Sequence, residues 1–194
     1  QDKPSQSRVR GKILRTKARG DIVFFILARA KGGGRVRIFC HYPQGAAFTP
    51  LHWRQMETAL EAMLEVLQAA APRAAEEFQV PAEVELFLLD DAAIADANAR
   101  HLGCTGPTNI LSFPGGADAP GVLLLSLDTL RRECLLYGQD PSEHAVRLLA
   151  HGMGHLCGLD HGPAMDALCE GCMDAGCTAL CNEGGAALAG VVSF

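Results

Sequence analysis

Three histidines stand at fixed spacing in the segment HGMGHLCGLDH, which spans residues 151–161. On a helix, residues four apart share one face, so His151 and His155 would lie about 5–6 Å apart at Cβ. A glycine at residue 158 can adopt the left-handed backbone that turns a chain back after a helix. His161 would then approach the same point from outside the helix.

Imidazoles that converge in this way predict a metal site. A catalytic zinc ion binds histidine nitrogens at roughly 2.0–2.1 Å, with three protein ligands and a fourth position open to water or substrate. A single histidine on an apolar face is commonly a core residue, whereas three at this spacing favour a ligand set. We therefore expect one zinc ion (Zn²⁺) per chain, held by His151, His155 and His161, with other first-row metals as alternatives.

The residue after the first histidine separates two kinds of chemistry. Zinc peptidases with the pattern H-E-x-x-H use that glutamate as general base, but this chain has Gly152. Bound zinc still lowers the pKa of its water to about 7. An RNA phosphodiester, which has its own neighbouring 2′-hydroxyl, needs the missing acid less. The spacing also matches metzincin-like metallopeptidases, in which Met165 or Met173 could form a methionine turn, and this alternative stays open.

Segments with strand or helix periodicity surround the motif. Apolar patterns predict strands over 35–41, 83–90, 108–114 and 121–127, and helices over 51–70, 91–103, 129–137 and 141–158. Asp128 and Asp140 are expected to cap the last two helices, and Gly103, Gly138 and Gly158 to end the last three. This order predicts an α/β (α+β) fold: a single domain with a small mixed four-stranded sheet packed with helices, and the metal site on a helix and the loop after it.

Charge is distributed unevenly along the chain. Residues 1–37 hold 11 lysines and arginines against two acids, whereas residues 38–194 hold six against 20. We expect a basic, flexible N-terminal extension over 1–34, a metal-dependent hydrolase domain over 35–182 and a C-terminal tail over 183–194. The extension could be a nucleic-acid arm or simply disordered. The acidic body argues against strong non-specific nucleic-acid binding, and no DNA partner is expected.

Eight cysteines could indicate disulfides, but four of them cluster in 169–181 and the others are scattered. This spacing favours a reduced, cytoplasmic compartment. Cys169, Cys172, Cys177 and Cys181 could bind a second metal, although incidental thiols are the simpler interpretation. No apolar run approaches the roughly 18–20 residues of a membrane span, so no membrane partner is expected.

Two segments together resemble a known family. HGMGHLCGLDH and PTNILSFP (residues 107–114) resemble the zinc motif H-G-x-x-H-L-x-G-x-D-H and the strand motif T-[DN]-[VI]-L-S-F-P of the YbeY family of rRNA maturation factors. The resemblance covers residues from about 36 to 168. It implies a single-strand-specific, zinc-dependent endoribonuclease in small-subunit (16S-type) rRNA processing and ribosome maturation. Its partners would be ribosomal RNA and the small ribosomal subunit or its assembly factors.

The resemblance also assigns residues. It places the zinc ligands on the three histidines, and it places Thr108, Asn109, Ser112 and Phe113 in the substrate groove beside the metal. Where the family has an arginine before the strand motif, this chain has Leu102, and where the family has an aspartate before the next strand, it has Val122. These departures keep open a non-catalytic, zinc-stabilised ribosome-assembly factor.

Four further residues are candidates for catalytic roles. Arg100 or His101 could contact phosphate in place of the missing arginine. Asp160 could orient a ligand imidazole, or serve only as a turn residue after Gly158. His144 lies two helical turns before His151, where it could shuttle protons or simply be exposed on the helix.

Overall fold

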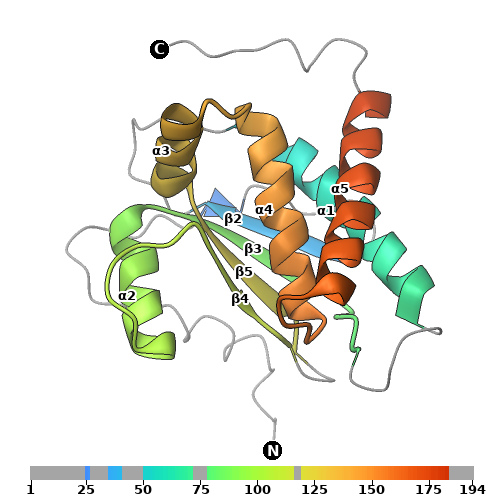
Figure 1. Cartoon of the computed structure of the whole chain (residues 1–194), viewed down its shortest axis with the longest axis horizontal. Helices are drawn as coiled ribbons and strands as arrows, with labels where there is room; N and C mark the ends of the chain where they lie inside the picture. Colours follow the sequence, from blue (N-terminus) through green and yellow to red (C-terminus); the bar gives the residue numbers. More distant parts are fainter. Residues whose placement is uncertain (1–24, 27–34, 41–49, 72–77, 116–118, 184–194) are drawn as a thin grey trace, which may run out of the picture.

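The computed structural model describes residues 25–26, 35–40, 50–71, 78–115 and 119–183 (Figure 1). Most of the extension predicted over 1–34, and all but the first residue of the tail predicted over 183–194, lie outside this description. The elements are β1 (Phe25–Ile26), β2 (Val36–Cys40), α1 (Trp53–Ala70), β3 (Val84–Leu89), α2 (Asp91–Leu102), β4 (Ile110–Phe113), β5 (Gly121–Ser126), α3 (Leu127–Tyr137), α4 (Pro141–Leu156) and α5 (Pro163–Glu183).

The strands form one mixed sheet in the order β1-β2-β3-β5-β4. Strands β2, β3 and β5 are parallel, whereas β1 and β4 run antiparallel to their neighbours at the two edges. The four expected strands are all present and the α/β fold is confirmed; the two-residue strand β1 adds a fifth. Because β4 ends the sheet, one of its edges pairs with no strand among the described residues.

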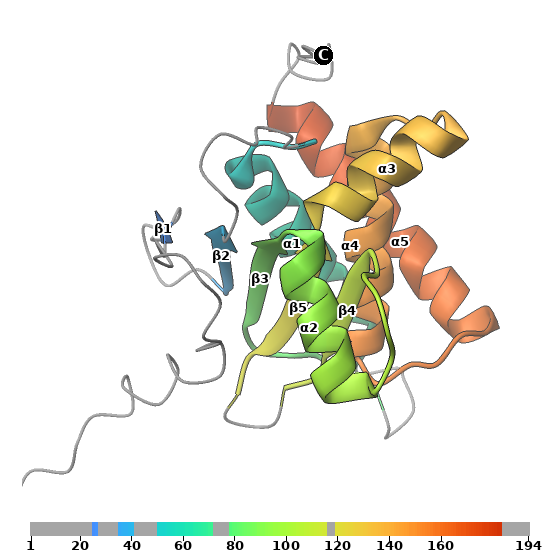
Figure 2. The same ribbon diagram turned by 90° about the vertical axis from the view of Figure 1, so that its left-hand side faces the viewer.

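Helices cover the two faces of the sheet unequally (Figures 1 and 2). Helix α2 packs on one face, over Leu124 and Leu111. Helices α1 and α4 pack on the other face, and α5 lies against α1 and α4. The larger core fills the space between the sheet and these three helices and contains none of the histidines of the motif. None of the described helices is long and apolar enough to cross a membrane.

Strand β5 is buried on both faces, as its continuous apolar sequence predicts. Leu123 and Leu125 point into the larger core, and Leu124 points into the cluster under α2. Side chains alternate along a strand, so both faces need apolar residues here. Strand β5 lies between β3 and β4, so it supports the edge strand β4 where β4 contacts α4.

Helices α1 and α3 begin within two residues of their predicted starts, at Trp53 and Leu127, and three other features differ from the prediction. Asp140 caps α4 by accepting hydrogen bonds from the backbone of Ser142 and Glu143. The cap of α3 is Ser126, whose Oγ accepts from the Thr129 N–H, so the cap predicted at Asp128 is wrong. Helix α4 ends at Leu156 instead of at residue 158, and the 21-residue α5 was not expected.

Candidate metal centre

Helix α4 aims His151 and His155 into one space. At about 100° per residue, Gly152 faces β4 and β5, Met153 is fully buried in the core, and Gly154 faces α5. The sector between Gly152 and Gly154 on the side opposite the core holds the two histidines. They therefore point between the edge strand β4 and the first turns of α5.

The loop between α4 and α5 brings His161 to the same place. Gly158 takes a left-handed φ of 81°, as expected, and its N–H donates to the His155 carbonyl at 3.0 Å. The Leu159 N–H then donates to the Gly154 carbonyl at 3.3 Å, which folds the chain back over the end of the helix. The exposed ring of His161 thus faces the two half-buried rings on α4.

The three imidazole rings form one cluster. Ring centroids are 4.7 Å apart for His151 and His155, 5.2 Å for His151 and His161, and 4.9 Å for His155 and His161. One ligand nitrogen of each ring lies within 4.8 Å of the other two. Tetrahedral bonds of about 2.0–2.1 Å place such nitrogens about 3.4 Å apart, which small ring rotations achieve. The triad can therefore bind one metal ion.

The cluster leaves a coordination position open. Across the described ranges, no fourth histidine, cysteine, aspartate or glutamate joins these three rings. A tetrahedral ion bound there would keep one position for water or substrate, which is the arrangement of catalytic zinc sites.

A backbone carbonyl fixes the ring of His155. Its Nδ1 lies 2.9 Å from the Leu159 carbonyl oxygen. A carbonyl can only accept a hydrogen bond, so Nδ1 carries the proton and Nε2 presents its lone pair to the cluster. This is the usual way in which a second partner orients a ligand histidine. The orienting role expected of Asp160 is filled here by the main chain.

The surroundings of His151 favour its neutral form. Burial is the main cause that lowers the pKa of His151, and the neighbouring His155 and His161 lower it further. Asp166, in the first turn of α5, opposes this effect. A neutral imidazole is the form that binds a metal ion.

Gly152 is a glycine because β4 leaves no room for a side chain. A Cβ at this residue would lie 2.8 Å from Ile110 Cδ1, 2.8 Å from Leu123 Cδ2 and 3.3 Å from Ser112 Oγ. The glutamate of the H-E-x-x-H peptidases would therefore begin inside the packing between α4 and the sheet. Met165 and Met173, the candidates for a methionine turn, both lie within helix α5. These observations count against the metallopeptidase alternative.

Comparison with known proteins identifies the family of this chain. A family model described as "Endoribonuclease YbeY" matches residues 50–171. The chain belongs to the YbeY family.

Similar proteins agree with this assignment. The Endoribonuclease YbeY of Nitratidesulfovibrio vulgaris is 50% identical over 115 residues, which cover 48% of this chain and 71% of that protein. The Endoribonuclease YbeY of Oleidesulfovibrio alaskensis is 40% identical over 146 residues, or 62% of this chain and 80% of that protein. The solution structure of TM1509 from Thermotoga maritima aligns with 76% of this chain and 90% of its own length, at 18% identity and a TM-score of 0.49. That last similarity is too weak to bear on the fold.

The YbeY strand motif contacts α4 at Gly152, the residue that follows His151. Ser112 faces Gly152, and its Oγ is buried without a hydrogen-bond partner. Thr108 is half-buried just before β4. Phe113, at the far end of β4, lies against His101 from α2 with ring centroids 5.1 Å apart. The structure thus brings together two residues that the sequence assigned to separate roles.

The structure also gives the surroundings of four other residues that the sequence analysis named. Arg100 forms an ion pair with Asp96 on the exposed side of α2. The carboxylate of Asp160 is exposed. Leu102 is 58% exposed, and Val122 is packed against the cluster under α2.

Both polar atoms of the Asn109 side chain form hydrogen bonds. Its Nδ2 donates to the Glu133 carboxylate, and its Oδ1 accepts from the Ile110 N–H. The groove role assigned to this side chain stays a prediction. Glu133 and Asp166 were both missed by sequence reasoning, because single acids on helices carry no spacing signal.

The cysteines do not form a second centre. All eight are free, and among the described residues the three histidines are the only group placed to hold a metal ion. Burial raises the pKa of Cys157 and of Cys172 to about 12. Along α5, Cys172 is buried, Cys169 and Cys177 are half-buried and Cys181 is exposed, so the cluster over 169–181 is best explained as thiols that face different surroundings.

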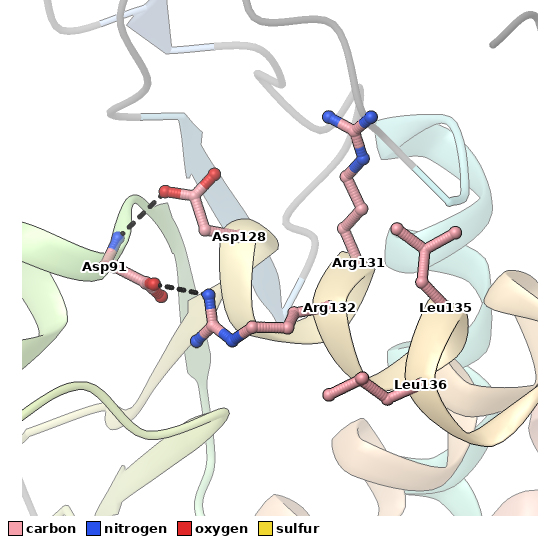
Figure 3. Close-up of a pocket in the computed structure, with 6 residues that line it drawn as sticks. All are labelled: Asp91, Asp128, Arg131, Arg132, Leu135 and Leu136. Carbon is pink, nitrogen blue, oxygen red and sulfur yellow. Dashed lines mark hydrogen bonds and ion pairs between the residues drawn. The ribbon is translucent and has the colours of Figure 1, made fainter.

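A hollow outside the centre lies where α2 and α3 begin (Figure 3). There the Asp91 carboxylate accepts from Arg132 at 2.8 Å, and the Asp91 N–H donates to Asp128 at 3.1 Å. The triad end of α4 is at the other end of β5, where Leu156 contacts Gly121. The hollow therefore takes no part in the metal centre.

Proposed function

We propose that this protein is a zinc-dependent endoribonuclease that cleaves single-stranded RNA. The observation that carries the proposal is the histidine triad with one open position, in a chain of the YbeY family whose relatives are named endoribonucleases. Zinc is the metal of choice because all three ligands are imidazoles and a tetrahedral site suits it.

In this proposal the metal ion, the protein side chains and the substrate have separate roles in the reaction. A zinc ion held by the triad would polarise a phosphoryl oxygen and lower the pKa of a bound water to about 7. The chain itself holds the ligand rings, with His155 fixed by the Leu159 carbonyl. Gly152 supplies no general base, so the substrate must need little help with proton transfer. RNA reduces this need because its 2′-hydroxyl already lies next to the scissile phosphate as a nucleophile; water at the site would accept the proton of that hydroxyl and return one to the departing 5′-oxygen.

The substrate groove runs beside β4. In this proposal Thr108, Asn109 and Ser112 border the RNA backbone, and the ring pair of His101 and Phe113 contacts an unstacked base. Aromatic rings bind single-stranded bases by stacking, whereas a duplex hides them. Arg100 and His101 remain candidates for phosphate contact, and Asp160 remains a candidate for a catalytic role.

The resemblance to the family also supports a proposal about the biological role. We assign the protein to small-subunit (16S-type) rRNA processing and ribosome maturation in the cytoplasm, with the small ribosomal subunit or its assembly factors as partners. The acidic body supports dependence on such a partner or on the basic residues 1–34, because phosphate binding needs local positive charge. Eight free cysteines support a reducing compartment.

Cleavage assays test the proposal directly. The zinc-loaded protein is incubated with single-stranded RNA, the same RNA as a duplex, single-stranded DNA and casein, each with and without a chelator. We expect chelator-sensitive cleavage of single-stranded RNA alone, and its loss in His155→Ala. His52→Asn is the matched control, because it removes a distant imidazole while asparagine preserves the helix cap. Equal cleavage by His155→Ala and the parent would contradict the zinc mechanism, and RNA binding without cleavage would support the assembly-factor alternative.

A further inference from the structure

A buried acid–histidine pair lies outside the metal centre. Nε2 of His144, on α4, is 2.7 Å from Oε2 of Glu133, on α3. The side chain of His144 is 8% exposed and that of Glu133 is 24% exposed. His144 is therefore not the exposed helix residue that its sequence position suggested, and a role in proton transfer stays a prediction.

The imidazole of His144 is held from one side only. A carboxylate only accepts hydrogen bonds, so Nε2 of His144 must donate to Glu133. Its Nδ1 is buried and has no hydrogen-bond partner. Buried polar atoms without partners cost stability, so an apolar residue would suit this place better if packing alone mattered. The pair is better explained by the second hydrogen bond that the Glu133 carboxylate accepts, from Asn109.

Glu133 connects the pair to the YbeY strand motif. Asn109 Nδ2 donates to Glu133 Oε1 at 3.1 Å and lies 3.4 Å from Oε2. Asn109 Oδ1 accepts from the Ile110 N–H at 2.7 Å, and the Asn109 carbonyl accepts from the Ser126 N–H at 2.8 Å. Side chain and main chain of Asn109 are thus both fixed at the residue that precedes β4.

The position of β4 matters because it borders the metal centre. Ser112 touches α4 at Gly152, and His151 and His155 point into the space beside that contact. The chain from His144 through Glu133 to Asn109 ties the first part of α4 to the start of β4. One end of β4 is therefore fixed to the helix that carries two of the three histidines.

We propose that Glu133 and His144 are positioning residues, which hold Asn109 and so set β4 against the metal-bearing face of α4. The expected effect of these residues on catalysis rests on the proposed function, in which β4 is a wall of the RNA groove. Their expected effect on the position of β4 is independent of that function. Misplacement of a substrate by about 1 Å costs roughly 100-fold in rate, so a loosened wall lowers kcat more than it weakens binding.

The test uses the full chain with zinc bound and three variants: Glu133→Ala, Asn109→Ala and the double variant. Glu143→Ala is the matched control, because Glu143 neighbours His144 but forms only an exposed ion pair with Arg147. Zinc content, hydrogen exchange of residues 108–114, and kcat and KM on a labelled single-stranded oligoribonucleotide are measured for each.

We expect one zinc per chain in every variant and exchange over 108–114 at least about tenfold faster in Glu133→Ala. The kcat should fall about 10- to 100-fold, with KM within about threefold of the parent. The double variant should lose no more than the worse single variant, because both remove the same link. Glu143→Ala should match the parent in all of these measurements.

Unchanged exchange over 108–114 in Glu133→Ala would overturn the proposal. Faster exchange with unchanged kcat, or multiplicative losses in the double variant, would overturn its catalytic part. If Glu133→Ala fails to fold, Glu133→Gln replaces it, since glutamine keeps one acceptor oxygen and should show a smaller change in the same direction. A parent that cleaves no RNA would refute the proposed function, while the exchange data would still decide whether Glu133 positions β4.

Discussion

A Cβ atom on Gly152 would lie 3.3 Å from the Oγ of Ser112, so helix α4 and strand β4 meet through a residue that has no side chain. The same Cβ would lie only 2.8 Å from two buried methyl groups. This contact places the histidines of α4 beside the edge of the sheet. Of the two glycines in α4, Gly152 is the one whose added Cβ would lie closer to its neighbours.

Gly152→Ala should destabilise the fold although alanine is the better helix former. Overpacking costs about 1–3 kcal/mol, and helix propensity returns about 1 kcal/mol. We expect a net loss of up to about 2 kcal/mol in the free energy of unfolding, measured with denaturant. Gly171→Ala is the control, because its Cβ would meet only Val66 Cγ1 at 3.8 Å and should stabilise by up to about 1 kcal/mol. Equal changes at both glycines would contradict the packing argument.

Zinc should bind once per chain and stabilise a protein that is already folded. At a free zinc concentration of 100 times Kd, binding adds about 2.7 kcal/mol. For a chain of this size that raises Tm by roughly 5–10 °C. The measurements are metal analysis and thermal unfolding with and without chelator. A chelated protein without secondary structure by circular dichroism would show instead that the metal holds the fold.

Loss of the loop ligand should weaken zinc binding without unfolding the domain. His161 is exposed and outside the core, so His161→Ala removes one ligand at little cost in packing. Loss of a partner of a ligand costs 10- to 100-fold in metal affinity, and loss of a ligand should cost at least about 100-fold. Competition with a zinc-binding dye measures this change. An unchanged affinity would exclude His161 from the ligand set.

The cysteines should divide into two groups by reactivity. Burial raises the pKa of Cys157 and Cys172 to about 12, so at pH 8 only about one thiol in 10,000 is ionised. Cys104 and Cys181 are exposed. We expect iodoacetamide at pH 8 to modify the exposed pair in the folded protein, and to reach Cys157 and Cys172 only after unfolding, as mass spectrometry of peptides can show. Rapid labelling of Cys172 in the native protein would contradict this assignment.

Asp91→Asn should reduce stability at neutral pH and much less in acid. Burial raises the pKa of Asp91, but hydrogen bonds from Arg132, Thr129 and Ser126 outweigh it, and the pKa lies below its ordinary value. The stabilisation is therefore present above the unfolded value near 3.8 and is lost as pH falls through the folded value. We expect a loss of about 1–2 kcal/mol at pH 7.

Asp96→Asn serves as the control for this acid effect. Asp96 pairs with Arg100 on the exposed side of α2, where such pairs contribute less than about 0.5 kcal/mol. Unfolding by denaturant at pH 7 and at pH 3 measures both variants. A loss in Asp91→Asn that is equally large at pH 3 would show that charge is not the cause.

Much of this fold is predictable because its elements carry strong local signals. The continuous apolar run 121–127 marks a strand buried on both faces, and Asp140 followed by Pro141 marks the start of α4. Helix α5 carries weaker signals, because it packs against both α1 and α4 and has no single apolar stripe. The cap at Ser126 was missed because this serine is also the last residue of β5.

The candidate site is predictable only where spacing along one helix defines it. His151, His155 and His161 follow from a local motif with a glycine at the turn. The pair of Glu133 and His144 depends on how α3 meets α4, and the contact of His101 with Phe113 depends on how α2 meets β4. Such contacts form between different helices and strands, so no local sequence pattern predicts them.

None of the three histidines is fully buried: His151 and His155 are half-buried, and His161 is exposed. A metal ion would therefore reach the three rings from the solvent side, without passing through the packing between the sheet and the helices. Binding and release of the metal would then be reversible. A change in the supply of the metal ion would change the activity of the protein without new synthesis or degradation.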